Sequence, residues 1–172
     1  MENFLNFARE RYSVRKYDAR PVEEDKVAAI LEAAKLAPTA RNNQPQKIYV
    51  VTSEEARKAL ATASPCTFGA PVVFVICYDD TLSAKGLILD GYDFGDIDAS
   101  IVCTHMMLEA HELGLGTCWV GYFKEAAVRA VLNVPENFRI RALLPTGYPA
   151  EGSVPSDRHL SYRPMEDMVE FV

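Results

Sequence analysis

The chain has 172 residues, 49% of them hydrophobic and 24% charged, which is typical of a single globular domain spanning 1–172. At this length a folded chain buries roughly 70% of the surface that it exposes when unfolded. The 24 Asp and Glu outnumber the 18 Lys and Arg, and the net charge of -6 argues against broad binding to nucleic acid or to an anionic membrane.

The N-terminus and the cysteines set expectations about location. MENFLNFARERYS has neither the basic nor the long apolar region of a secretory signal. The longest apolar run, from Ala70 to Tyr78, is too short to span a bilayer. The four cysteines are scattered, and apolar neighbours around Cys77 and Cys103 favour buried reduced thiols. We therefore expect a soluble, cytoplasmic protein.

Proline, glycine and serine residues mark the expected boundaries between helices and strands. In the first half we expect a helix over 2–11, a helix from Pro21 to Pro38, a loop over 39–45, a strand over 47–53 and a helix from Ser53 to Ala63. Next we expect a strand over 71–78 covered on both faces, a loop with Gly86, Gly91 and Gly95, and a long central helix over 96–113 ended by Gly114. The last part should form a strand and turn over 117–123, a helix over 124–132, a strand over 139–149 and an ordered tail over 156–172.

These elements lack the steady βαβ rhythm of a parallel sheet. They predict the α+β class, with helices flanking a mixed β-sheet.

Several common catalytic devices are absent from the sequence. GLGTCWVG (114–121) follows a helix and lacks the third glycine of the dinucleotide fingerprint, and Tyr122 and Phe123 stand where a phosphate loop needs Lys and Ser or Thr. The three histidines form no HxxxH or HExxH pair, so we expect no metal site. A cysteine nucleophile paired with His105 or His111 has no local signature, and core thiols with packed imidazoles are the favoured interpretation of these residues.

Two polar stretches each allow two interpretations. Cations crowd into RERYSVRKYDAR (9–20), which is either a solvated charged face or an extended segment whose Arg11, Ser13 and Arg15 converge on one anion such as phosphate. APTARNNQPQ (37–46) either simply ends the preceding helix or forms a polar clamp for a heteroaromatic ring or a phosphate. The residues alone leave both choices open.

Four motifs in this order resemble the FMN-dependent nitroreductase family, in particular its small, compact members. They are RYSVRKYDARPV (11–22), AAKLAPTARNNQPQ (33–46), GLGTCWVGYF (114–123) and RHLSYRP (158–164). The first is similar to the family's Arg-x-Ser-x-Arg/Lys segment, the second to its Ala-Pro-Ser-Ala-x-Asn-x-Gln-Pro-Trp loop, and the third to its Gly-Leu-Gly-Thr-x-Trp-x-Gly turn. The resemblance runs from about Phe7 to the C-terminus.

The resemblance implies an α-β-α sandwich and an interlocked homodimer with FMN at the interface. Arg11 and Ser13 would hold the flavin phosphate and ribityl chain, and Arg15 would lie near N1 and the C2 carbonyl. The loop after Pro38 would come from the other subunit, backbone groups of 118–121 would face N5, and two tail arginines would complete the phosphate site. The cofactor-binding residues implied are Arg11, Tyr12, Ser13, Arg15, Pro38, Thr39, Ala40, Asn42, Gln44, Cys118, Trp119, Val120, Gly121, Arg158 and Arg163.

The chain departs from the family pattern in three places. Thr39 replaces the common Ser, and Gln46 replaces the Trp that usually follows Pro45. The segment ALATASPCTFGAP (59–71) is short and lacks an Asn/Lys pair found near the flavin pyrimidine in longer members, so the ring contact there could fall to Phe68.

The resemblance also implies the chemistry. NAD(P)H would pass hydride to flavin N5 and leave, and a nitroaromatic, quinone or similar conjugated acceptor would then take the electrons, so that no catalytic side chain is required. The alternative within this resemblance is a flavin-binding storage or sensor protein without NAD(P)H turnover. A third possibility is a flavin-free hydrolase or transferase that uses Cys66 or Cys118.

Overall fold

The computed structural model of the protein describes residues 3–86 and 90–172. Within them, one sheet has the strand order β1-β2-β4-β3. The strands are β1 (Gln46–Val51), β2 (Val72–Asp79), β3 (Gly116–Thr117) and β4 (Phe138–Gly147). The first residue of the helix predicted over 2–11 and the middle of the glycine-containing loop lie outside the described residues.

The ladders between these four strands are all antiparallel, which corrects the expected mixed sheet. Parallel pairing within the described residues is limited to one isolated bridge, between Ser13 and Thr117. Local patterning locates strands, but their direction depends on where each connection returns to the sheet. The α+β class itself is confirmed.

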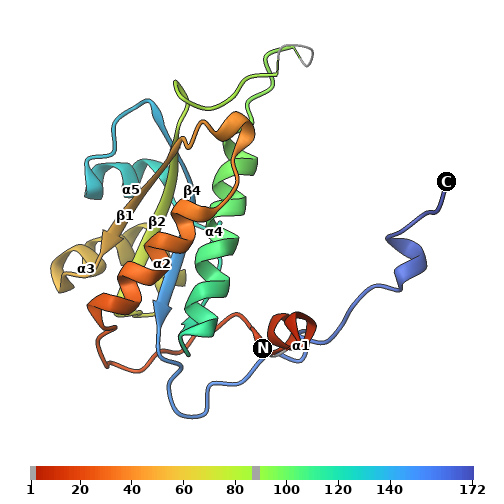
Figure 1. Cartoon of the computed structure of the whole chain (residues 1–172). Coiled ribbons are helices and arrows are strands. Elements are labelled where there is room, and N and C mark those ends of the chain that lie inside the picture. The colour runs from red at the N-terminus through yellow and green to blue at the C-terminus, as the bar shows by residue number, and fades with distance from the viewer. Residues whose placement is uncertain (1–2, 87–89) are drawn as a thin grey trace.

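Helices cover both faces of the sheet (Figure 1). One face packs against α2 (Glu24–Leu36) and α4 (Gly95–Glu112), the other against α3 (Glu54–Ala63) and α5 (Glu125–Leu132). Along β2, Phe74 and Ile76 face the first pair of helices while Val73 and Val75 face the second, and all four are buried. The prediction that this strand is covered on both faces is confirmed.

Local signals in the sequence explain where three helices begin or end. Ser53 caps α3 by accepting a hydrogen bond from the Ala56 N–H at 3.3 Å. Ala37 is extended because Pro38 disfavours helical backbone before it, and α2 ends there. Gly114, with φ of +75°, ends α4 in the left-handed conformation that glycine adopts without a steric penalty.

The two ends of the chain lie side by side and then separate. Helix α1 (Phe4–Glu10) contacts the start of the C-terminal tail, where His159 Nε2 lies 2.8 Å from the Arg9 carbonyl oxygen. Beyond this contact the tail, with the short helix η3 (Met165–Asp167), leads away from the body (Figure 1). None of the helices in the described ranges is both long and apolar enough to cross a membrane.

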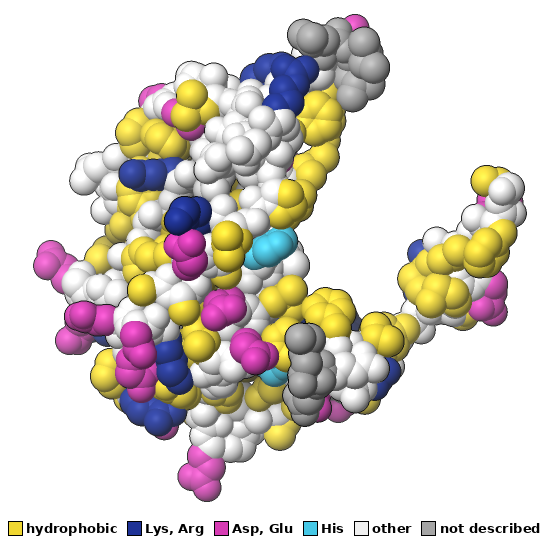
Figure 2. Space-filling model, viewed as in Figure 1, with side chains coloured by type: hydrophobic (Ala, Val, Ile, Leu, Met, Phe, Trp, Pro, Cys, Tyr) yellow, Lys and Arg dark blue, Asp and Glu magenta, His cyan; other side chains and the backbone are white. Residues whose placement is uncertain are grey.

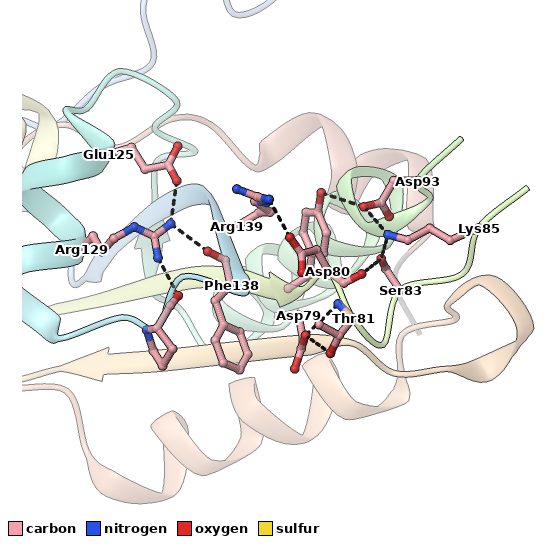
Figure 3. A network of polar contacts seen from close by, with 12 residues as sticks. Asp79, Asp80, Thr81, Ser83, Lys85, Asp93, Glu125, Arg129, Phe138 and Arg139 are labelled. Atoms are coloured by element: carbon pink, nitrogen blue, oxygen red, sulfur yellow. Dashed lines mark hydrogen bonds and ion pairs between the residues drawn. The ribbon is translucent and has the colours of Figure 1, made fainter. Parts of the chain in front are cut away.

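A polar network fixes the segment that follows β2 (Figure 3). Asp79 Oδ1 accepts from the Thr81 hydroxyl at 2.6 Å, and Lys85 pairs with Asp93 at 2.7 Å. Asp80 pairs with Arg139 of β4 at 2.7 Å. The Asp80–Arg139 pair therefore ties the segment 79–85 to the sheet, and the other contacts hold it locally.

Candidate functional site

The basic segment runs in extended form along the edge of the sheet. The Val14 N–H donates to the Thr117 carbonyl oxygen at 2.9 Å, and the Val14 side chain is 1% exposed. A Cβ atom on Gly116 would overlap the Val14 side chain, so only glycine permits this approach. Since side chains alternate along an extended chain, burial of Val14 turns Ser13 and Arg15 away from the core.

Two of the four arginines of this segment, Arg11 and Arg15, are not neutralised by the described residues. Within the part of the chain that the structure describes, neither Arg11 nor Arg15 pairs with a carboxylate. Arg15 donates a long bond of 3.4 Å to the carbonyl oxygen of Ser13. Guanidinium groups left without an acid beside a hydroxyl have the donor chemistry of an anion site.

Cys118 connects this segment to the turn that follows β3. Burial raises the pKa of the Cys118 thiol, while Arg15, the Ser13 hydroxyl and Arg11 lower it to a lesser degree. The bridge between Ser13 and Thr117 places the segment beside this turn. A thiol with a raised pKa is mostly protonated at neutral pH, which argues against a Cys118 nucleophile.

The turn offers unused backbone donors at the sheet edge. The N–H groups of Cys118 and Val120 donate to β4, to Pro145 at 3.3 Å and Leu143 at 2.9 Å. Those of Trp119 and Gly121 donate to no other described residue. A Cβ on Gly121 would meet nothing within 4 Å, so this backbone faces open space.

One chain alone supplies only part of a cofactor pocket here. The cavity beside the segment has a volume of about 180 Å³ and is lined by Arg11, Tyr12, Val14, His111, Gly114, Leu115, Gly116, Thr117 and Pro149. Sites for cofactor-sized ligands usually measure about 300–1,000 Å³. A cofactor bound at this edge therefore needs further walls.

The polar loop 39–45 lies at the opposite end of α4. Its Ala40 N–H donates to Asp98 Oδ1 at 2.8 Å, in the first turn of the helix, whereas the basic segment contacts residues just beyond the last turn. An α-helix of 18 residues is about 27 Å long. The structure thus does not bring the predicted loop residues to the basic segment of the same chain.

Within the loop, the predicted cofactor-binding residues differ in what they can offer. The Ala40 N–H is already bonded to Asp98. Thr39 Oγ1 accepts from the Gln44 N–H at 3.1 Å, and its hydroxyl hydrogen has no acceptor among the described residues. The Asn42 side chain has no hydrogen-bond partner among the described residues, and Pro38 precedes the loop. Asp98 itself was missed, because an acid in the first turn of a helix is an ordinary feature.

The remaining predicted residues lie on or near the tail. Tyr12 donates its hydroxyl to the Ser153 carbonyl oxygen at 3.1 Å and packs edge-on against His159, so it anchors the base of the tail. Arg158 is exposed beside this anchor. Arg163 lies further along the tail, on the part that leads away from the body (Figure 1), where it donates to the Asp167 carbonyl oxygen at 3.1 Å.

Comparison with known proteins assigns the chain to a family. A model described as the nitroreductase family matches residues 8–67 and 62–148. A nitroreductase family protein from Clostridium difficile 630 is 36% identical, with a TM-score of 0.91 and 98% of each chain covered. An FMN-dependent nitroreductase from Clostridium difficile R20291 is 30% identical, with a TM-score of 0.78, 97% of this chain and 98% of that chain covered. The NADH dehydrogenase of Thermus thermophilus is 32% identical over 185 residues, covering 88% of this chain and 89% of that protein.

The chain belongs to the nitroreductase family. The family and fold predicted from the motifs are therefore confirmed, whereas the roles of the individual site residues stay predictions.

The residues at the sheet edge fit the flavin mononucleotide of such proteins. Two guanidiniums without acidic partners in the described part of the chain, together with one hydroxyl, suit its phosphate and ribityl groups. Two backbone N–H groups next to them, at Trp119 and Gly121, suit the acceptor atoms of a flat heteroaromatic ring.

Proposed function

We propose that the protein is an FMN-dependent oxidoreductase that uses NAD(P)H to reduce a nitroaromatic, a quinone or a similar conjugated acceptor, and that residues 1–172 form one FMN-binding domain. The observation that carries this proposal is the pair Arg11 and Arg15. Neither has a carboxylate partner among the described residues, and both lie beside Ser13 and an open backbone turn.

Each group at the sheet edge has a distinct task in this proposal. Arg11 and Ser13 bind the phosphate and ribityl chain, and Arg15 places a positive charge beside the ring, where reduction develops negative charge. The free backbone N–H groups after Cys118 orient the ring. When bound, FMN supplies the hydride-accepting and hydride-donating chemistry, and the chain's own residues bind it, orient it and balance its charge.

The same proposal explains why no side chain is set up as a nucleophile. The raised pKa of Cys118 keeps its thiol protonated, and NAD(P)H and the acceptor would use one exposed face of the cofactor in turn. This alternation is the ping-pong order that the family resemblance implies. The flavin-free enzyme based on a Cys118 thiolate is disfavoured for this reason.

We further propose that the active form is a homodimer in which each site combines two chains. The basic segment and the loop 39–45 lie at opposite ends of α4, too far apart to hold one FMN within a chain. Two depressions, of about 430 and 360 Å³, lie along α4 and share His105, and the second lies between α1, α2 and α4. A second copy seated on this face would bring its loop toward the basic segment.

The tail supports the same arrangement. Seven of its apolar side chains are at least 44% exposed: Leu160, Tyr162, Met165, Met168, Val169, Phe171 and Val172. Figure 2 shows apolar side chains on the part that projects from the body. Monomers rarely expose apolar patches of this kind without a partner, so we propose that the tail, with Arg163, packs on the second chain.

The test of the proposed function is the visible absorption spectrum of freshly purified protein, recorded before and after anaerobic addition of NADPH or NADH. We expect a yellow protein that bleaches on addition of the nicotinamide and regains colour with a quinone or nitroaromatic. A yellow protein that does not bleach would support the storage or sensor alternative. A colourless protein that cannot be reconstituted with FMN would contradict both.

A further inference from the structure

The loop that follows α2 has an unusual backbone. Arg41, Asn42 and Gln44 have φ of 57°, 56° and 50°, so three of four consecutive residues are left-handed. None is glycine, and a Cβ atom makes this conformation unfavourable. Such strain persists only where the surroundings hold it, and it clusters at ligand clamps and active sites.

Two side chains hold this loop: Asp98, which belongs to α4, and Asn43, which belongs to the loop itself. Asp98 Oδ1, on α4, accepts from the Ala40 N–H at 2.8 Å. Asn43 Nδ2 donates to the Leu82 carbonyl oxygen at 2.9 Å, on the segment 79–85 that the network of Figure 3 fixes. The first anchor reaches from the loop to the start of a helix, and the second ties the loop to the end of the sheet.

The Asp98 carboxylate is costly where it lies. Its side chain is 2% exposed, and Oδ2 is buried without a hydrogen-bond partner in the described parts of the chain. The neighbouring positions Ala99 and Val102 belong to the apolar core. A buried carboxylate with one incompletely used oxygen lowers stability relative to an apolar side chain, so its presence indicates a task other than stabilising α4.

We propose that Asp98 is a positioning residue for the cofactor: it holds the loop 39–44 in its left-handed, ligand-ready shape, with Asn43 as the second anchor. This inference rests on the proposed function, since the ligand is the FMN of the second chain. A loop held in the binding conformation does not have to be ordered when the ligand binds, which raises affinity. Asp98 contributes without touching the cofactor, because its side chain is only 2% exposed.

The first experiment compares FMN dissociation constants of the full-length protein and three variants. Asp98→Ala removes the acceptor, and we expect the dissociation constant to rise about tenfold or more because the competent loop becomes a minor population. Asp98→Asn keeps an acceptor oxygen for the Ala40 N–H and should stay within about threefold of the original protein. Glu54→Ala, which removes an exposed acid from the first turn of α3, should leave FMN binding unchanged.

A further variant and a second measurement distinguish the loss of an anchor from a general loss of folding. Asn43 is exposed, so Asn43→Ala should keep the melting temperature while weakening FMN binding severalfold. Amide hydrogen exchange in the FMN-free protein should show a protected Ala40 N–H, and Asp98→Ala, if folded, should lose this protection while Asp98→Asn retains it.

Two results would overturn the inference. Asp98→Ala or Asn43→Ala could bind FMN as tightly as the original protein, or Asp98→Asn could bind as weakly as Asp98→Ala. Failure of the original protein to bind FMN would instead refute the proposed function. In that case an unprotected Ala40 N–H in the FMN-free protein would refute the positioning role as well.

Discussion

The two ends of α4 carry the two halves of the proposed site, and the chain builds them by different means. At the C-terminal end the basic segment is placed by backbone pairing with Thr117 and by close approach of Val14 to Gly116. At the N-terminal end the loop 39–44 is placed by side chains, chiefly Asp98 and Asn43, that bind backbone groups.

The difference determines what each half leaves free for a ligand. Backbone pairing leaves the Arg11 and Arg15 side chains without acidic partners among the described residues, so that end supplies charge. Side-chain anchoring uses up the Ala40 N–H and imposes a strained backbone, so that end supplies shape. Substitutions at the first end should act through packing and charge, and those at the second through conformation.

The largest effect on the first half should come from Gly116→Ala. The new Cβ would lie 2.8 Å from the Val14 Cβ, so the basic segment must move off the sheet edge. We expect the free energy of unfolding to fall by about 2–3 kcal/mol, the scale of an overpacked core, together with loss of bound FMN. Urea denaturation measures the first effect. Gly121→Ala, where a Cβ meets nothing within 4 Å, is the matched control, and equal destabilisation by both changes would rule out the close approach as the cause.

Arg11→Ala should weaken FMN binding by about 1.5–3 kcal/mol, the usual scale for a hydrogen bond to a charged group. Because Arg11 has no acidic partner in the described residues, the free energy of unfolding should stay within about 0.5 kcal/mol of its original value. Fluorescence titration with FMN measures the affinity. Lys16→Ala removes a neighbouring cation of the same run that donates to the Glu151 carbonyl oxygen. Equal effects of the two changes would favour a general charged face over an anion site.

A smaller effect is expected from Thr39 in the second half. Thr39→Val removes the oxygen that accepts from the Gln44 N–H, and FMN binding should weaken by about 1 kcal/mol. Thr39→Ser keeps the hydroxyl and should bind like the original protein. The same titration measures both variants, and a serine variant as weak as the valine variant would show that the hydroxyl alone does not account for the contribution of Thr39.

The smallest effect concerns pH and the first half. Burial, and to a lesser extent the nearby Arg11, lowers the pKa of His111. The unfolded chain then binds the proton at a higher pH than the folded chain, so the free energy of unfolding should fall as the pH drops below about 6.5. His111→Gln should flatten this part of the profile in urea denaturation at pH 8, 6 and 5. At pH 8 the imidazole is neutral in both the folded and the unfolded chain, so a difference between the two proteins at that pH reflects an effect other than protonation. If the free energy of unfolding falls equally in both proteins below pH 8, His111 is not the group responsible.

Much of the first half could be predicted from the sequence, because its signals are local. An extended run with Val14 among polar neighbours fixes which side chains face outward, and the turn after β3 carries a recognisable glycine pattern. Helix ends at Ser53, Pro38 and Gly114 are equally local and were predicted.

The second half and the strand directions depend on tertiary structure. Nothing in the sequence of one chain shows that the loop 39–45 lies a helix length away from the basic segment, or that Asp98 is buried against it. Gln46, where the family pattern has Trp, is half-buried with Oε1 unpartnered among the described residues, an environment that the local sequence does not reveal. The antiparallel direction of the strands likewise depends on where each connecting segment leads the chain back into the sheet, and local sequence patterns do not encode this.

The central claim is that each FMN site takes one half from each chain, and mixing two damaged variants tests it most directly. Arg11→Ala damages the first half and Thr39→Val with Asn42→Ala damages the second. We expect each variant alone to retain little FMN. After the two are unfolded and refolded together, mixed dimers should regain about one FMN each, because one of their two sites receives both intact halves. If mixed dimers form and regain none, the two halves belong to one chain, and the account of a shared site is wrong.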